Sequence, residues 1–394
     1  MLKISVDKFK IGQNSMKFKI GQEEFSKALL FVGRSLFTKV NLPILSNILI
    51  SSSKNHLEIL STNLETATKV VASCVGESDG KVTIPGKPLF EFVSQLPEGD
   101  IILEKLGEEV LVSTKRYSAR FATMPTDDFP AIPKIEAGKS VFVSAADFSK
   151  AVLRVAFCAA QDEGRPVLTG VLCDFSKDGF SMVATDGYRL SFVKVGASGK
   201  MDTPIKVVMP SKSIVEAAKI IADYGEKMKD SKVELLIADS QNQVNFKIGN
   251  CEYTSRLIEG TFPAWQKLIP AEFTSKAKIS KEELTKVVKV ASIFARDAGS
   301  IVKFKLEAQG SKGGSLSVSA ANSQVGSNEA SCDIDLSGKG GEIAFNFRYI
   351  LEVLSTIDSE DVEFEMIESL NPGRLTIGGE DNYFHIIMPV RLQS

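Results

Sequence analysis

The chain has 394 residues, of which 43% are apolar and 24% charged, the composition of a globular protein long enough for about two to four domains. Its net charge of −2 excludes a globally basic nucleic-acid binder but is compatible with a local stripe of cations. The five cysteines are odd in number and have no CxxC spacing, which favours reduced thiols in the cytoplasm over a disulfide framework.

No apolar run approaches the roughly 18 residues that a membrane-spanning helix requires, and the N-terminus lacks the apolar core of a signal peptide. The chain is therefore expected to be cytoplasmic and to have no membrane contact. The hexapeptide KFKIGQ occurs at 8–13 and again at 17–22, directly after Met16. Residues 1–15 are interpreted as an N-terminal extension outside the fold.

A helical segment with one apolar stripe occurs three times. Apolar residues at i, i+3, i+4 and i+7 start at Phe25, Phe148 and Leu284, and this spacing predicts a helix with one buried face. The offsets, 148 − 25 = 123 and 284 − 148 = 136, indicate a repeated unit of domain size. The stripes comprise Phe25, Ala28, Leu29, Val32, Phe148, Ala151, Val152, Val155, Leu284, Val287, Val288 and Ala291.

A second helix follows in each repeat with the same apolar spacing. It starts at Leu89, Ile214 and Ile350, with offsets of 214 − 89 = 125 and 350 − 214 = 136. Its stripes comprise Leu89, Phe92, Val93, Leu96, Ile214, Ala217, Ala218, Ile221, Ile350, Val353, Leu354 and Ile357. Each repeat therefore contains two amphipathic helices.

Every predicted helix carries a cation roughly opposite its apolar stripe. In the first helix the cation stands two residues after the start of the stripe, and in the second it stands two residues before. A lysine is common on any solvated helix face, but a cation at the corresponding place of all six helices favours a shared role. These cations are Lys27, Lys150, Lys286, Lys87, Lys212 and Arg348.

Strand-like segments lie around the helices. Two helices cannot enclose so many strands, so antiparallel sheets with helices on one face only, an α+β architecture, are expected. Loop-like segments near 133–139 and 270–275 separate the predicted domains 16–138, 139–272 and 273–394. The predicted strands are 56–62, 82–85, 100–106, 109–114, 181–186, 189–195, 232–238, 243–249, 315–321, 361–366 and 374–379.

Four motifs, NLPILSNILI (41–50), ATDGYRLS (184–191), RLIEGTFPAWQKLIP (256–270) and IIMPVRL (386–392), resemble in order segments of the bacterial beta sliding clamps. That family is the processivity factor of the replicative DNA polymerase III. The resemblance implies three repeated clamp domains and a head-to-tail homodimer that forms a ring around double-stranded DNA. Cations opposite the core would then face phosphates and attract DNA without reading its sequence.

The resemblance also implies a cleft that accepts short linear peptides from the replicative polymerase, the clamp loader and repair proteins. Its apolar floor would hold hydrophobic anchors, while Arg189 and Asn346 would orient the peptide through hydrogen bonds. Carried over to this chain, the cleft comprises Leu168, Thr185, Gly187, Tyr188, Arg189, Leu190, Pro263, Lys267, Leu268, Asn346, Tyr349, Ile387, Met388, Pro389, Val390 and Arg391.

Some of these residues have a second interpretation. Leu190 and Ile387, taken singly, also fit an ordinary hydrophobic core. Tyr188 and Lys267 stand where family members have histidine and arginine, so the resemblance does not fix the detailed peptide preference.

Family DNA contacts carry over to Lys39, Gln161 and Arg165. The loop around Arg165 reads GRPVL, where some relatives place aromatic residues, so weak stacking on DNA is expected. The predicted DNA-facing residues are Lys27, Lys39, Lys87, Lys150, Gln161, Arg165, Lys212, Lys286 and Arg348.

Three apolar residues lie outside the repeated stripes and are predicted at the dimer interface. Ile293 and Phe294 extend the first helix of the third repeat, and Phe121 lies on a predicted edge strand of the first. Large apolar groups in such places fit a subunit contact. Additional core at the helix end is the alternative.

No enzyme chemistry or cofactor is expected. His56 and His385 are the only histidines, with no spacing for a metal site or a Ser-His-Asp centre, and no phosphate-binding glycine loop occurs. The pair Asp127 and Asp128 is better explained by a turn than by a two-carboxylate active site. A carboxylate enzyme and a peptide-binding scaffold that does not bind DNA remain the alternatives.

Overall fold

The computed structural model describes residues 16–36, 42–132, 135, 137–176, 179–198, 204–228, 230–238, 242–309 and 313–391. By its internal contacts the chain divides into two compact units. The first takes in the described parts of 1–140 and 232–256, and the second takes in the described parts of 141–231 and 257–394.

The first unit is built from two helices and short strands. They are α1 (Gln22–Val32), α2 (Gly86–Ser94), β1 (Lys17–Gly21), β2 (Asn47–Ser53), β3 (His56–Thr62), β4 (Thr66–Ser73), β5 (Val75–Ser78), β6 (Gly80–Pro85), β7 (Asp100–Leu106), β8 (Glu109–Ser113), β9 (Ser118–Ala122), β16 (Lys232–Ala238), β17 (Gln243–Ile248) and β18 (Cys251–Arg256). One antiparallel sheet has the order β5-β1-β7-β8-β9, and another contains the run β16-β17-β18-β4-β3-β2-β6.

The second unit has four helices and one large sheet. Its elements are α3 (Ala145–Val155), α4 (Ser211–Tyr224), α5 (Lys281–Ala295), α6 (Phe347–Ser355), β11 (Gly170–Ser176), β12 (Gly179–Thr185), β13 (Arg189–Val195), β14 (Ala197–Ser198), β15 (Ile205–Pro210), β19 (Ser275–Ser280), β20 (Ile301–Gln309), β21 (Gly313–Asn322), β22 (Gly326–Gly338), β23 (Gly341–Asn346), β24 (Asp361–Met366), β25 (Gly373–Ile377) and β26 (Glu380–Ile387). The sheet has twelve strands in the order β15-β11-β12-β13-β26-β25-β24-β19-β22-β21-β20-β23. Strand β10 (Gly138–Ser144) crosses the division between the units.

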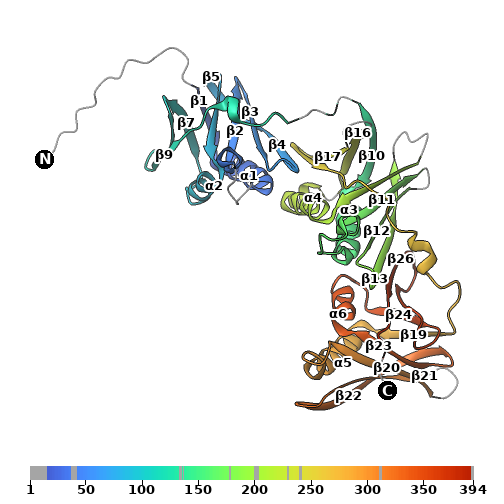
Figure 1. Ribbon diagram of the computed structural model, residues 1–394. Coiled ribbons are helices and arrows are strands. Elements are labelled where there is room, and N and C mark those ends of the chain that lie inside the picture. The colour runs from blue at the N-terminus through green and yellow to red at the C-terminus, as the bar shows by residue number, and fades with distance from the viewer. Residues whose placement is uncertain are drawn as a thin grey trace. The chain divides into compact units, whose positions relative to one another are not determined.

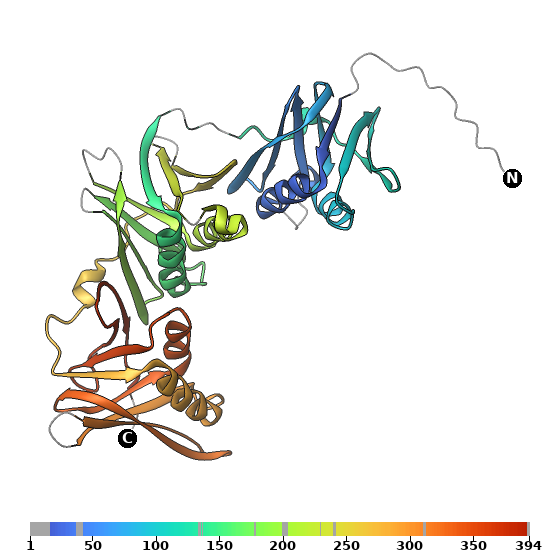
Figure 2. The ribbon, with the colours of Figure 1, turned by 180° about the vertical axis from the view of Figure 1, so that it is seen from behind.

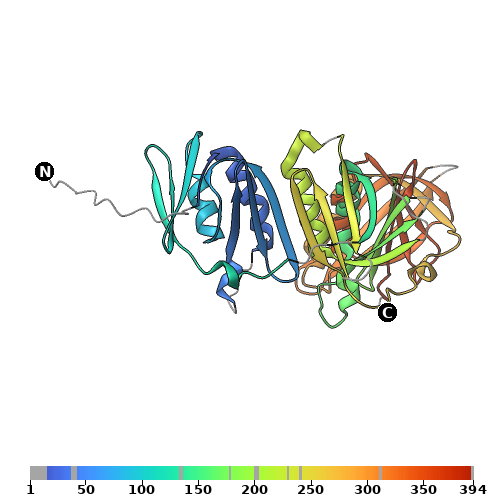
Figure 3. The ribbon, with the colours of Figure 1, turned by 90° about the horizontal axis from the view of Figure 1, so that it is seen from above.

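The helices pack in pairs, α1 with α2, α3 with α4 and α5 with α6. Within each pair both helices lie on the same side of the neighbouring strands (Figures 1 and 2), and in Figure 3 α1, in dark blue, runs along the strands of the first unit. The predicted α+β architecture is therefore confirmed. None of the helices in the described part of the chain has both the length and the apolar character that a membrane crossing requires.

The predicted apolar stripes form the contacts between helices and sheets. All of their residues are buried except Phe92 and Ala218, which are half-buried. Ser144 and Ser280 cap α3 and α5, since their hydroxyls accept the N–H groups of Asp147 and Glu283, donors that have no partner inside a helix. Periodicity and caps together account for where these helices form.

Candidate functional site

A tight turn joins β12 to β13 and forms one wall of the predicted cleft. The Thr185 hydroxyl donates to the Arg189 carbonyl at 2.6 Å and accepts the Gly187 N–H at 3.0 Å. The Asp186 carboxylate accepts the N–H groups of Tyr188 and Arg189 at 2.9 and 3.0 Å. Gly187 has a φ of 93°, a conformation that favours glycine. These hydrogen bonds fix the turn and leave Tyr188 62% exposed.

The C-terminal segment runs alongside this turn. Strand β26 pairs with β13 so that Arg189 is opposite Ile387. Beyond the strand, the Met388 N–H donates to the Tyr188 carbonyl at 2.8 Å, and the Val390 N–H donates to the Ala344 carbonyl at 2.8 Å. The backbone of this segment is therefore anchored on both sides.

An apolar cluster underlies the turn. Leu190 and Ile386 are 1% and 2% exposed, and Phe262 and Trp265 of the segment between β18 and β19 pack against them together with Leu168. The Trp265 ring lies 5.3 Å from that of Phe192 between centroids. Segments far apart in sequence thus meet at one apolar surface, which suits hydrophobic anchors of a ligand.

Arg189 is the charged group at the centre of this region and is 9% exposed. It donates to Asp186 at 3.1 Å and to the Phe157 carbonyl at 3.1 Å, and it is also bonded to Glu352. Burial is the largest single influence and opposes its charge, but the hydrogen bond to Glu352 and the negative charges of Glu352 and Asp186 together raise the pKa of Arg189 above its ordinary value. Its guanidinium lies 4.5 Å from the ring centre of Tyr349, a cation–π contact. Arg189 is therefore held in one charged orientation.

The remaining residues predicted for the cleft differ in exposure. Pro263, Lys267, Leu268 and Arg391 are exposed, and the Asn346 side chain accepts the Arg348 N–H at 3.0 Å, which caps α6. The second unit therefore brings together the turn, the C-terminal segment, Leu190 and Tyr349. The sequence prediction of the site omitted Phe262, Trp265 and Ile386, although Trp265 is the only tryptophan of the chain.

The predicted DNA-facing cations lie mostly on exposed helix surface. Lys87 and Lys286 form ion pairs with a glutamate on the same helix, at 3.9 and 2.6 Å, and Lys150 pairs with Glu380 at 3.7 Å. Such exposed pairs are weak and leave the cations available to phosphates. Lys212, Arg348, Gln161 and Arg165 are exposed, Lys27 is half-buried, and Lys39 lies outside the described residues.

The predicted dimer residues lie at the margins of their units. Phe121 is half-buried on β9, the last strand of its sheet, with its ring 6.0 Å from that of Phe92. Ile293 is 59% exposed and Phe294 half-buried, both within α5 as predicted.

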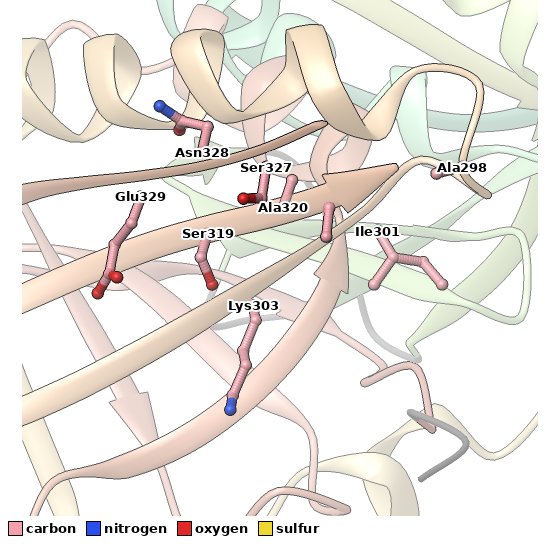
Figure 4. A pocket seen from close by; sticks show the side chains of 9 residues that line it. Ala298, Ile301, Lys303, Ser319, Ala320, Ser327, Asn328 and Glu329 are labelled. Carbon is pink, nitrogen blue, oxygen red and sulfur yellow. The ribbon is translucent and has the colours of Figure 1, made fainter. Parts of the chain in front are cut away.

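A pocket of about 530 Å³ opens on the strands that pack against α5. Figure 4 shows Lys303, Ser319 and Glu329 pointing away from the helix, whereas Asn328 points toward it. The Asn328 side-chain oxygen is buried without a hydrogen-bond partner among the described residues. Along β22, only the last residues, from Asp335 to Gly338, pair with β19. The first part of β22 is thus an edge strand.

The described residues contain no group of three His, Cys, Asp or Glu that would hold a metal ion. All five cysteines are buried and free. Burial raises the pKa of the Cys158 and Cys173 thiols, which makes them poor nucleophiles. The pair Asp127 and Asp128 lies in a short 3-10 helix, Thr126–Asp128, in agreement with the predicted turn.

Sequence profiles for the three domains of the DNA polymerase III beta subunit match consecutive parts of the chain. The N-terminal domain matches residues 16–133, the central domain 143–264 and the C-terminal domain 266–391. A beta sliding clamp of Synechocystis is 29% identical over 96% of this chain and 100% of its own length. One of Pseudomonas putida is 26% identical over the same shares of both chains.

Solved structures match over the same extent. The DNA polymerase sliding clamp of Bacillus subtilis has the same fold, with a TM-score of 0.89 at 21% identity, and covers 96% of this chain and 100% of its own. A sliding clamp of Pseudomonas aeruginosa bound to griselimycin has a TM-score of 0.88 at 25% identity and the same coverage.

Proposed function

The chain belongs to the DNA polymerase III beta subunit family, the bacterial beta sliding clamps, and is a DNA sliding clamp; we propose that two copies close around duplex DNA and tether the replicative polymerase to it. The observation that carries this proposal is the cation opposite the buried stripe of each of the six described helices. A recurring cation at that place suits contact with regularly spaced phosphates and requires no base-specific side chain.

The ring would close between the margins of two copies. Strand β9 and the first part of β22 are edge strands, and an exposed edge is suited to pairing with another chain. Ile293 supplies exposed apolar surface next to this edge, because α5 packs on β22. The Asn328 oxygen would find a hydrogen-bond donor in such a contact. A head-to-tail dimer of this kind buries both features.

The cleft on the second unit would bind the replicative polymerase, the clamp loader and repair proteins through short peptides. Its apolar cluster, the fixed Arg189 and the half-buried Met388 support this, since an adaptable thioether suits a site with several ligands. Griselimycin, which is bound to the Pseudomonas aeruginosa clamp, is proposed as a ligand of this cleft as well.

Sliding clamps are in general processivity factors without their own catalysis, and we extend this to the present chain. A cytoplasmic location is also proposed, from the five free, buried cysteines. The domain boundaries at 138/139 and 272/273 and the interpretation of 1–15 as an extension remain proposals. The relatives do not favour a scaffold that avoids DNA or a carboxylate enzyme.

Whether the protein encircles DNA is tested by comparing its retention on circular and on linear DNA. The protein is loaded onto a nicked circular plasmid by a bacterial clamp loader with ATP, and the bound fraction is measured by gel filtration before and after a restriction enzyme linearises the plasmid. We expect retention on circles and loss from linear DNA, because a ring slides off free ends. Equal retention on both forms, or none on circles, would contradict the proposal.

A further inference from the structure

The turn that forms one wall of the cleft occurs a second time, in the first unit. The Thr62 hydroxyl donates to the Thr66 carbonyl at 2.9 Å and accepts the Leu64 N–H at 3.0 Å. Thr185 makes the same two bonds with Arg189 and Gly187, at an offset of 185 − 62 = 123 residues. Because this offset equals that of the first helices, the two turns are equivalent parts of the repeat.

The match extends to the other hydrogen bonds of the turn. The Asn63 side chain accepts the N–H groups of Glu65 and Thr66 at 3.0 and 2.7 Å, as Asp186 does in the cleft. Leu64 has a φ of 75° at the position of Gly187, and a leucine adopts this left-handed conformation only when its surroundings impose it. The two turns therefore share their hydrogen bonds and backbone conformation although their sequences differ.

The neighbouring strand is also equivalent. Thr66 is opposite Ser255 in the pairing of β4 with β18, as Arg189 is opposite Ile387 in the pairing of β13 with β26. The Arg256 N–H donates to the Glu65 carbonyl at 3.0 Å, which repeats the bond from Met388 to Tyr188. Turn and strand thus enclose a space of the same construction as the cleft.

The side chains around the turn of the first unit leave a pocket. Ala67 stands at the position that Leu190 fills in the cleft, and a pocket of about 370 Å³ opens there. A second pocket of about 350 Å³ shares Ala67, Ile132 and Thr254 with the first, so the two form one groove. Its combined size is within the range of about 300–1,000 Å³ that ligand sites occupy. We name it the first-unit groove and define it by Leu64, Ala67, Ile132, Gln243, Asn245 and Thr254.

Two buried acceptors in this groove have no hydrogen-bond partner among the described residues, the Gln243 Oε1 and the Asn245 Oδ1. Asn245 is 7% exposed, and its Nδ2 donates to the Thr254 hydroxyl at 2.8 Å. Buried acceptors normally have a donor, so these oxygens indicate a ligand that donates. The charges around the groove include ion pairs that satisfy one another, Lys69 with Glu252 at 2.9 Å and Arg256 with Glu65 at 3.8 Å.

We propose that the first-unit groove is a second peptide-binding site, which takes an uncharged, extended peptide with a small aliphatic anchor. Main-chain N–H groups of the peptide donate to Gln243 and Asn245, and the anchor occupies the space beside Ala67 and Ile132. Main-chain amides fit because they supply donors without charge, and Ala67 leaves room for an anchor at the position that the Leu190 side chain fills in the cleft. This site is additional to the proposed cleft and independent of it.

The test is methyl NMR of the labelled full-length protein, titrated with the capped tripeptide acetyl-Leu-Ala-Leu-amide to millimolar concentration. The Leu64 and Ile132 methyls report on the groove, and those of Leu268 and Met388 report on the cleft. We expect saturable shifts at Leu64 and Ile132. Saturable shifts confined to the cleft methyls, or none at the groove, would overturn the proposal.

The matched variant is Ala67→Leu, which places in the groove the residue found at the equivalent position of the cleft. We expect it to weaken binding at the groove at least tenfold and to leave the cleft methyl shifts unchanged, whereas Ala67→Ser retains binding. If Ala67→Leu does not fold, Ala67→Val fills part of the same space. Equal groove affinity in the filled variant and the parent contradicts the proposal. DNA retention and cleft binding are measured separately, so this failure leaves the proposed function intact.

Discussion

Met388 is held in place through its backbone, because its N–H donates to the Tyr188 carbonyl, while its side chain is half-buried and belongs to the proposed cleft. Changing the side chain therefore alters the surface of the cleft without releasing the C-terminal segment. Arg256, which makes the equivalent backbone hydrogen bond beside the first-unit groove, shows that this backbone arrangement accepts a very different side chain.

Replacing Met388 with Glu is expected to weaken griselimycin binding by about 2 kcal/mol or more, as is typical of an anchor contact, which is a roughly 30-fold loss of affinity. The physical reason is an unpaired charge placed against apolar surface. Calorimetric titration measures the affinity, and Met388→Leu is the control, which should retain binding. Unaltered affinity of the Glu variant would place the ligand outside this cleft.

His385 is fully buried, with its Nδ1 near the Ser191 hydroxyl at 3.3 Å and the Cys158 sulfur at 3.7 Å. Burial, with a smaller contribution from the Arg189 charge, lowers the pKa of His385 to about 3. The unfolded chain binds this proton more tightly, with a pKa of about 6.5. The stabilisation is therefore complete above about pH 6.5 and is lost as the pH falls toward 3.

We expect the free energy of unfolding to fall by up to roughly 1.4 kcal/mol per pH unit below pH 6.5 from this group alone. The His385→Gln variant lacks this titrating group, so its free energy of unfolding should fall less steeply with pH, by up to the same roughly 1.4 kcal/mol per pH unit. Urea unfolding between about pH 7 and pH 5 provides the comparison. Identical pH slopes for the two proteins would show that His385 is not the responsible group.

At the scale of elements, helices were the most predictable part. Their stripes follow a single period over two turns, and the structure confirms them. Strands 100–106, 189–195, 232–238 and 361–366 also match β7, β13, β16 and β24 residue for residue. Strand β22 was missed, because its first half is an edge with exposed polar side chains and lacks the apolar alternation of a strand with one buried face.

The candidate site was less predictable, since no local pattern encodes a contact between distant segments. Ser191 on β13 and His385 on β26 are 194 residues apart, yet their strands pair. Phe262 lies in a loop and Trp265 begins a 3-10 helix of four residues, too short for a period to identify core residues, so their place in the apolar cluster depends on tertiary packing. The turn at Asp186-Gly187 differs from these contacts, because the φ of 93° at Gly187 favours a glycine, and an Asp-Gly pair is a local signal of a turn.

The helix cations are expected to act as a group. Changing Lys150, Lys212 and Arg348 to Gln should lower DNA retention and flatten the dependence of log affinity on log salt by about 0.9 for each lost phosphate contact. The helices should still fold, because these side chains lie opposite the core stripes. Retention on circular DNA at several salt concentrations measures the slope.

The matched control removes the same charge from strands. Lys206, Lys303 and Lys305 lie on β15 and β20 and are exposed or half-buried. Their change to Gln should leave the salt slope unaltered. Equal slopes for the helix and strand variants would show that the helices have no special role in DNA binding.

At the scale of the whole molecule, the exposed apolar surface of α5 leads to the last prediction. Val290 and Ile293, one turn apart on this helix, are 42% and 59% exposed, and adjacent exposed apolar side chains near an edge strand fit a surface that a partner covers. Leu370, also 59% exposed, lies in the turn between β24 and β25 and provides a control of equal exposure.

Changing Ile293 and Phe294 to Glu should bury unpaired charge at the contact and release folded monomers. Sedimentation would then give 42.8 kDa instead of twice that mass, while Leu370→Glu stays dimeric. Because Phe294 is half-buried, Ile293→Glu alone serves where the double variant loses its fold. A dimer that survives Ile293→Glu at micromolar concentration would mean that the ring closes through another surface.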